Sequence, residues 1–154
     1  MIKYIKEDTM VVFSEIPTEI SLAINISNCQ NNCIGCHSPY LRKDVGETLN
    51  IDVIDELIEK NKGVTCFLFM GEGNDIGNLC NFSKYIKEKY GLLTALYSGK
   101  QKIEQYMVDN FDYIKIGPYM EEFGPLNKKT TNQRLYKIIK PDNKIDDITY
   151  MFWK

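Results

Sequence analysis

The clearest pattern in the chain is an alternation of apolar runs with amphipathic segments. Residues 64–70 are almost continuously apolar, which is typical of a strand buried on both faces of a parallel sheet. In residues 51–60 the apolar side chains recur at helical spacing, with Asn50 suited to the N-cap and Gly63 able to end the helix. The same reasoning predicts strands at residues 11–13, 21–27, 92–97 and 113–116, and helices at residues 78–90 and 102–108.

Strands that alternate with helices predict an α/β fold with a parallel sheet and right-handed crossovers. The chain has 154 residues, whereas a closed eightfold barrel needs about 250. We therefore expect a single domain over residues 1–154 that contains only part of such a barrel. Residues 134–140 and 148–153 flank a Pro141 turn and predict a hairpin outside the barrel.

Each predicted strand is followed by a break that could carry a site. Residues 71–75, Ser98-Gly99 and Gly117-Pro118 come directly after strands, and a cysteine-rich segment follows residues 21–27. Ligands of parallel α/β folds bind at the carboxyl ends of the strands. We expect these breaks to lie together.

Composition and charge limit the classes of function. The chain is 44% apolar and 26% charged, with a formal net charge of −2, and its basic residues are dispersed. A dedicated nucleic-acid surface is therefore not expected. The N-terminus lacks the apolar stretch of a signal peptide, and no run reaches the ~18 apolar residues of a membrane span. We expect a cytoplasmic protein with reduced thiols.

The candidate chemistry centres on Cys29, Cys33 and Cys36, which have the spacing C-x3-C-x2-C. Disulfides between such close cysteines would be strained, and the total of five cysteines is odd. A zinc site closed by His37 would have four ligands. Three thiolates at one corner suit an iron-sulfur cube better, because its fourth iron then stays open for substrate.

The other two cysteines are expected to be structural. Cys66 falls in the strand of residues 64–70, about four residues and hence ~13 Å before its carboxyl end, too deep to ligate a cluster in the loops. Cys80 falls on the helix of residues 78–90, where its thiol packs against the sheet or faces solvent. A free cysteine packs as a small hydrophobic side chain.

The cysteine spacing resembles the cluster loop of radical S-adenosylmethionine (SAM) enzymes. Gly35-Cys36-His37-Ser38-Pro39 is similar to the G-C-H-N-P run of glycyl-radical activating enzymes. Gly117-Pro118-Tyr119 and residues 130–134 (Thr-Thr-Asn-Gln-Arg) resemble the G-P-Y and T-N-Q-R signatures of one branch. That branch contains the activating proteins of anaerobic ribonucleoside-triphosphate reductase, and the resemblance covers about residues 21–139.

The resemblance implies a fold and a set of site residues. The fold would be an open partial (βα) barrel of the radical SAM type, in a short version. Cys29, Cys33 and Cys36 would hold a [4Fe-4S] cluster that binds and cleaves S-adenosyl-L-methionine. Gly35 and His37 would lie beside the cofactors, although His37 could equally be a turn histidine without a metal role.

The resemblance also implies that Gly71 and Glu72 bind the SAM ammonium, as the G-G-E-P segment of the family does. Here the segment reads Met70-Gly71-Glu72-Gly73, so only the central Gly-Glu matches, and a plain turn is the alternative. Ser98 and Lys115 are weaker candidates for SAM contacts. The T-N-Q-R stretch could bind the partner or shape the mouth of the site.

The activity implied is the generation of a glycyl radical on the catalytic subunit of the anaerobic reductase. An electron donor such as flavodoxin or ferredoxin would reduce the cluster. A short chain without a substrate domain leaves a barrel that a protein loop can enter, which favours a macromolecular substrate. Two alternatives stay open: another activase or small radical SAM enzyme, and a zinc-stabilised binding module.

Overall fold

The computed structural model describes residues 2–27 and 45–153. The strands are β1 (Lys3–Tyr4), β2 (Met10–Val12), β3 (Ser21–Asn25), β4 (Glu47–Thr48), β5 (Cys66–Met70), β6 (Leu93–Tyr97), β7 (Tyr113–Ile116), β8 (Arg134–Ile139) and β9 (Lys144–Asp147). The helices are α1 (Ile51–Lys60), α2 (Ile76–Tyr90) and α3 (Gln105–Asn110), with 3-10 turns η1 (Lys6–Asp8) and η3 (Thr149–Phe152). The α/β class is confirmed.

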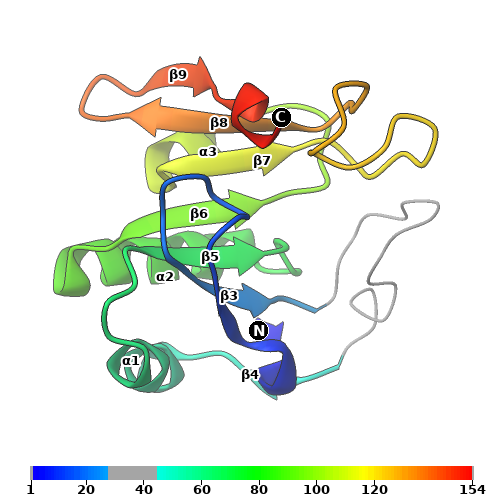
Figure 1. The fold of residues 1–154 in the computed structure, drawn as a ribbon. Coiled ribbons are helices and arrows are strands. Elements are labelled where there is room, and N and C mark those ends of the chain that lie inside the picture. Colours follow the sequence, from blue (N-terminus) through cyan, green and yellow to red (C-terminus); the bar gives the residue numbers. More distant parts are fainter. Residues whose placement is uncertain (1, 28–44, 154) are drawn as a thin grey trace.

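Seven of these strands form one mixed sheet, in the order β2-β3-β5-β6-β7-β8-β9. Strands β3, β5, β6 and β7 run parallel to one another, and their arrowheads point the same way in Figure 1. β2 pairs antiparallel with β3 at one end, and the β8–β9 hairpin extends the sheet beyond β7 at the other. β1 and β4 form a separate two-stranded sheet.

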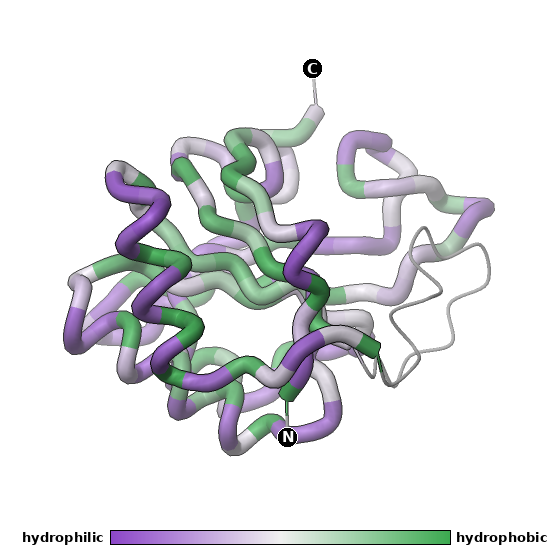
Figure 2. Tube along the Cα trace, turned by 90° about the horizontal axis from the view of Figure 1, so that it is seen from below, coloured by the Kyte–Doolittle hydropathy of each residue, from purple (hydrophilic) through white to green (hydrophobic). Residues whose placement is uncertain are grey.

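The order of the parallel strands in space follows their order in sequence. Crossovers of one hand between successive neighbours place their helices on one face of the sheet. Ile54 of α1, Leu79 of α2 and Met107 of α3 accordingly share a core with Leu22 and Phe67. Figure 2 shows the strands as largely apolar tube surrounded by more hydrophilic helices and turns.

The opposite face of the sheet has a second, smaller core. Ala23, Leu68 and Ala95 pack there with Ile16 from the β2–β3 connection and Ile148 from the C-terminal segment. The Tyr113 hydroxyl donates to Glu19 Oε2 at 2.8 Å, which holds the same connection in place. Non-strand segments therefore cover the face that has no helices.

The helix ends follow the expected capping chemistry. Asn50 caps α1 by accepting a hydrogen bond from the Val53 N–H at 2.9 Å. Gly91 ends α2 in the left-handed conformation, with φ of 66°. Helix α2 begins two residues earlier than the sequence indicated, because Asp75 accepts a hydrogen bond from the Asn78 N–H at 3.1 Å.

The predicted C-terminal hairpin is wrong in two respects. Its second strand is β9 (Lys144–Asp147), whereas residues 149–152 form the 3-10 turn η3. The hairpin is also part of the main sheet, because β8 pairs with β7. Burial explains the first error: Ile148 and Phe152 pack onto the second core, so the chain bends across the sheet. Helix α3 also lies later than the predicted residues 102–108.

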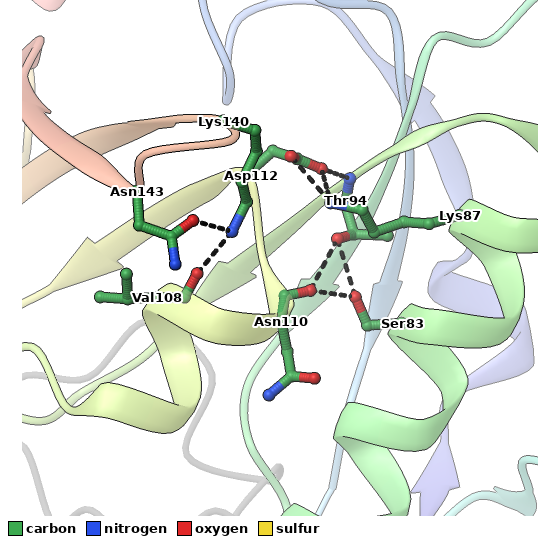
Figure 3. A network of polar contacts seen from close by, with 8 residues as sticks. All are labelled: Ser83, Lys87, Thr94, Val108, Asn110, Asp112, Lys140 and Asn143. Atoms are coloured by element: carbon green, nitrogen blue, oxygen red, sulfur yellow. Dashed lines mark hydrogen bonds and ion pairs between the residues drawn. The ribbon is translucent and has the colours of Figure 1, made fainter.

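A polar network closes the amino-terminal edge of the parallel strands (Figure 3). Asp112, immediately before β7, accepts two hydrogen bonds from Lys87 Nζ at 2.8 and 2.9 Å, and one from the Thr94 N–H at 2.9 Å. Ser83 donates to Thr94 Oγ1 at 2.8 Å, which joins α2 to β6. Buried polar groups satisfied in this way stabilise the packing of α2, β6 and β7.

No helix in the described part of the chain is long and apolar enough to cross a membrane.

Candidate functional site

The carboxyl ends of the parallel strands are joined by hydrogen bonds that continue the ladder into the loops. The Gly71 N–H donates to the Tyr97 carbonyl at 3.0 Å, and the Ser98 N–H donates to the Lys115 carbonyl at 2.8 Å. The Gly117 N–H then donates to the Lys100 carbonyl at 2.6 Å. The breaks after β5, β6 and β7 therefore lie side by side, as the sequence predicted.

The turn after β5 packs tightly against the end of β3. Gly71 and Gly73 have φ of +123° and +67°, values that side chains rarely adopt. A Cβ atom at Gly71 would lie 3.2 Å from the Ile26 carbonyl oxygen, and one at Gly73 would lie 2.9 Å from Ile26 Cγ2. The close approach that these glycines permit is to the strand that leads into the cysteine segment.

Glu72 is the centre of a side-chain cluster, here called the Glu72 cluster, which consists of the buried Glu72 and Ser98 and the partly exposed Lys100 and Tyr106. Glu72 is 8% exposed and Ser98 is 1% exposed. Ser98 Oγ donates to Glu72 Oε1, and the Tyr106 hydroxyl donates to Glu72 Oε2 at 2.7 Å. Lys100 Nζ lies 3.5 Å from the same Oε2. The cluster thus joins the loops after β5 and β6 to helix α3.

The charge of Glu72 is balanced within this cluster. Burial alone would lower the pKa of Lys100, but hydrogen bonds to Tyr106 and Glu104, both at 3.0 Å, and the Glu72 charge raise it above its usual value. Burial is the main cause of a raised pKa at Tyr106. The hydrogen bond from Lys100 lowers this pKa, and the hydrogen bond to Glu72 raises it. Both groups therefore stay protonated at neutral pH, so that Tyr106 donates to Glu72 and the Lys100 ammonium forms an ion pair with it.

A carboxylate has about four acceptor positions; hydrogen bonds from Ser98 and Tyr106 use two of them, and Lys100 Nζ forms an ion pair with Oε2. The arrangement can bind a cation either at the remaining position on Oε1 or by displacing the Lys100 ammonium. Its chemistry is therefore suited to a positive group at the carboxyl ends of the parallel strands.

Two motifs that are distant in sequence meet beside this edge. The Asn132 amide donates to the Pro118 carbonyl at 2.9 Å, and the Gln133 amide donates to the Gly117 carbonyl at 3.3 Å. A Cβ atom at Gly117, whose φ is +98°, would lie 3.0 Å from Gln133 Cα. The two side chains therefore hold the turn after β7, and Gly117 lets the segments touch.

The residue that follows these amides has a different environment. Arg134 Nη1 lies 3.7 Å from Asp147 Oδ2, and its guanidinium lies 5.8 Å from the Trp153 ring centroid. Lys115 Nζ lies 5.4 Å from the Tyr97 ring centroid, on the sheet face opposite Ile114 and Ile116. Neither cation belongs to the Glu72 cluster.

Cys66 and Cys80 are buried free thiols, as expected. Cys66 is the first residue of β5 and packs in the second core, whereas Cys80 packs in the core on the helix side. Burial raises the pKa of Cys66 to about 12, and it also raises the pKa of Cys80. Both thiols are therefore protonated at neutral pH.

The predicted ligands Cys29, Cys33 and Cys36, together with Gly35 and His37, lie outside the described residues. Within residues 2–27 and 45–153, no three His, Cys, Asp or Glu side chains gather closely enough to hold a metal ion. Of the predicted site residues, the structure places Gly71 and Glu72 beside Ser98 at one edge of the sheet. This grouping is the candidate site.

Sequence reasoning missed Lys100 and Tyr106. Lys100 follows the Ser98-Gly99 break by one residue, so its place in a loop after a strand was a usable signal. Tyr106 carried no such signal, because an aromatic residue at helical spacing suggests core packing.

Comparisons of the chain with models of protein families, with curated proteins and with solved structures found no match.

Proposed function

We propose that this protein is a radical SAM activase that generates a glycyl radical on the catalytic subunit of anaerobic ribonucleoside-triphosphate reductase. The observation that carries the proposal is the packing of Gly71 and Gly73 against Ile26 and Ser27. Cys29 follows Ser27 by two residues in the sequence. Ser27, the last described residue before the cysteine segment, thus lies beside the turn that the resemblance assigns to SAM.

In this proposal the sheet is the short, open (βα) barrel of the radical SAM type. The sequential order of β3, β5, β6 and β7 supports it, because a doubly wound sheet reverses its strand order at a switch point. The helices α1, α2 and α3 on one face of the sheet also support it. Cofactors of such folds lie at the carboxyl ends of the strands, where the Glu72 cluster lies.

Three cysteine thiolates suit an iron-sulfur cube with one open iron, so Cys29, Cys33 and Cys36 would hold a [4Fe-4S] cluster. When bound, the cluster would supply the electron for reductive cleavage of SAM, and this chemistry would remove a hydrogen atom from the partner's glycine. Gly35 and His37 would line the same site. Flavodoxin or ferredoxin is the proposed electron donor.

The described residues would bind and orient SAM. The Glu72 carboxylate would receive the SAM ammonium, because it is a buried negative group with acceptor positions that Ser98 and Tyr106 leave unused. The turn after β7, held by Asn132 and Gln133, would form another wall of the site. The contribution of the protein is orientation of SAM and exclusion of water.

The test is anaerobic purification and reconstitution with iron and sulfide, followed by incubation with SAM, a reductant and the reductase subunit. We expect a brown protein, 5′-deoxyadenosine, and a glycyl radical in the electron paramagnetic resonance spectrum. Cys29→Ala, Cys33→Ala and Cys36→Ala should each abolish SAM cleavage, because two thiolates cannot hold the cube with the same open iron.

Other outcomes identify the alternatives. A colourless protein that retains zinc would contradict the proposal and favour the zinc-stabilised module. SAM cleavage without a radical on the reductase would instead indicate another activase or a small radical SAM enzyme. Full SAM cleavage in any one of the three cysteine variants would overturn the ligand assignment.

A further inference from the structure

The outermost strand β9 (Lys144–Asp147) has one strand partner, β8, in the part of the chain that the structure describes. Figure 1 shows β9 at the margin of the sheet, beyond β8. All four of its residues are exposed, including Ile145 at 47%. An edge strand of this kind offers backbone groups to another strand.

The hydrogen bonds of the hairpin show which backbone groups are offered. The Ile138 N–H donates to the Asp112 carbonyl at 2.7 Å, so the backbone of Ile138 faces away from β9. Ile138 is opposite Ile145 in the β8–β9 register. At such a non-hydrogen-bonded position of an antiparallel pair, the backbone N–H and C=O groups of the two residues point away from each other. The N–H and C=O of Ile145 therefore point out of the sheet edge.

The side chains of β9 are arranged so that the strand complements itself. When β9 strands of two copies pair antiparallel about a twofold axis, each residue of one copy lies opposite a residue of the other copy whose side chain is on the same face of the sheet. With the axis at Ile145, Lys144 of each copy is opposite Asp146 of the other. The two Ile145 side chains then meet beside Ile138, which belongs to the helix-side core.

Other twofold registers within β9 are unfavourable. An axis at Lys144 places two lysines opposite each other, and an axis at Asp146 or at Asp147 places two aspartates opposite each other. Like charges at directly opposed positions are destabilising. The register is therefore specified by the sequence Lys-Ile-Asp-Asp alone.

We propose that β9 pairs with β9 of a second copy of this chain, centred on Ile145, to form a continuous antiparallel sheet across a weak homodimer. The pair is held by reciprocal hydrogen bonds between the Ile145 backbones, two Lys144–Asp146 ion pairs and one Ile145 contact. One short strand pair buries less than the roughly 1,200 Å² of a standard interface, so the dimer dissociates on dilution. This inference does not depend on the proposed activity.

The test is sedimentation equilibrium of the full chain over micromolar to millimolar concentrations. The wild type should show a reversible monomer–dimer equilibrium that rising salt weakens, since exposed ion pairs are screened. Lys144→Asp and Asp146→Lys should each weaken the dimer about tenfold, because each replaces two attractive cross-strand pairs with two repulsive ones.

Charge reversal supplies its own control. The double variant Lys144→Asp/Asp146→Lys restores both ion pairs between the copies and should bind more tightly than either single variant, although the lysine introduced at position 146 then lies opposite Lys137 of β8 within each copy. An equimolar mixture of the two single variants should form heterodimers. Met10→Lys alters β2 at the opposite edge of the sheet and should have no effect. Circular dichroism spectra should be the same for all variants.

Three results would overturn the proposal: a monomer at every concentration, a dimer that is insensitive to charge reversal, or a dimer that Met10→Lys abolishes. A monomer would mean that the charges of β9 protect the edge from pairing, which is a common role of edge lysines.

Discussion

Two buried carboxylates lie at opposite ends of the parallel strands, Asp112 at the amino ends and Glu72 at the carboxyl ends. Each has a lysine beside it. Asp112 accepts a hydrogen bond from the Thr94 main chain as well as two from Lys87 (Figure 3). Glu72 is held by the side chains of Ser98, Lys100 and Tyr106. Asp112 thus accepts a hydrogen bond from the main chain of a central strand, whereas the partners of Glu72 are side chains.

This difference assigns different roles to the two edges. A carboxylate that satisfies a buried strand N–H cannot move without leaving that group unpaired, at a cost of about 1–3 kcal/mol. A carboxylate held by side chains of a loop and of helix α3, with no strand N–H among its donors, can exchange one donor for a ligand and leave the sheet intact. The amino edge therefore supports stability, and the carboxyl edge is suited to binding, as in other folds with parallel strands.

The largest effect on stability should come from Asp112→Ala. Loss of the carboxylate leaves the Thr94 N–H without its acceptor and Lys87 without its partner, so the free energy of unfolding should fall by about 3 kcal/mol. Urea denaturation measures it. Asp112→Asn, which retains an acceptor for the Thr94 N–H, is the matched control and should lose about 1 kcal/mol. Equal losses would mean that the ion pair with Lys87 dominates.

Glu72→Gln should have a smaller effect on stability and a larger effect on binding. The amide keeps the shape of the side chain but brings its NH2 group against the donors of the cluster, which should cost about 2 kcal/mol. If the proposed function is correct, the dissociation constant for SAM should rise about tenfold or more, because the charge that attracts the ammonium is lost. Isothermal titration of the anaerobically reconstituted protein measures it. Unchanged SAM affinity would remove Glu72 from the site.

Cys66→Ala tests whether the amino edge is closed, because Cys66 begins β5 there. The substitution should lower the free energy of unfolding by about 1 kcal/mol as a small core truncation, with iron content unchanged. A thiol whose pKa is raised to about 12 has little thiolate near neutrality, so maleimide at about pH 8 should not modify Cys66 in the folded protein. Labelling becomes faster only as the pH rises toward that pKa.

If the proposed function is correct, Cys66→Ala and the companion variant Cys80→Ser should both keep full iron content and the response of the cluster to SAM. Loss of one iron in either variant would show that a buried cysteine is a ligand, which would contradict the open-iron assignment. Rapid modification of Cys66 in the native protein would show that the amino edge opens.

Lys100→Met should have the smallest effect on stability, below about 1 kcal/mol, because the lysine is partly exposed and its pairs are screened. It should also tighten SAM binding by a few fold if the proposed function holds, since the ammonium of the lysine no longer competes for Glu72. A weaker affinity would indicate that Lys100 itself contacts the ligand. Lys60→Met, which removes an exposed lysine from α1, is the control and should change neither quantity.

Local sequence was sufficient to predict the repeating elements. Helix α1 was predicted with its observed bounds, since Asn50 and the apolar spacing act within a few residues. Strand β7 was also predicted with its observed bounds. Residues 148–153 were misassigned because their conformation depends on the burial of Ile148 and Phe152 against a distant face of the sheet.

The candidate site likewise contains residues that the sequence could predict and residues whose roles it could not predict. Gly71, Glu72 and Ser98 could be selected from sequence, because breaks after parallel strands converge at one edge of a sheet. The cysteine triad stays a prediction, since it lies outside the described residues. The roles of Asn132 and Gln133 could not be predicted, because they depend on contacts with a turn about fifteen residues away in sequence.

The sequence by itself determined the alternation of strands and helices, the N-cap of α1, the end of α2 at Gly91, and the residue types available for chemistry. These properties follow from side-chain periodicity and from backbone preferences that act over a few residues. Only the tertiary structure decided which donors surround Glu72, which chain the glycines of the Gly71 turn approach, and which backbone groups β9 exposes. Those contacts join residues far apart along the chain, so they depend on how the strands register and how the loops pack.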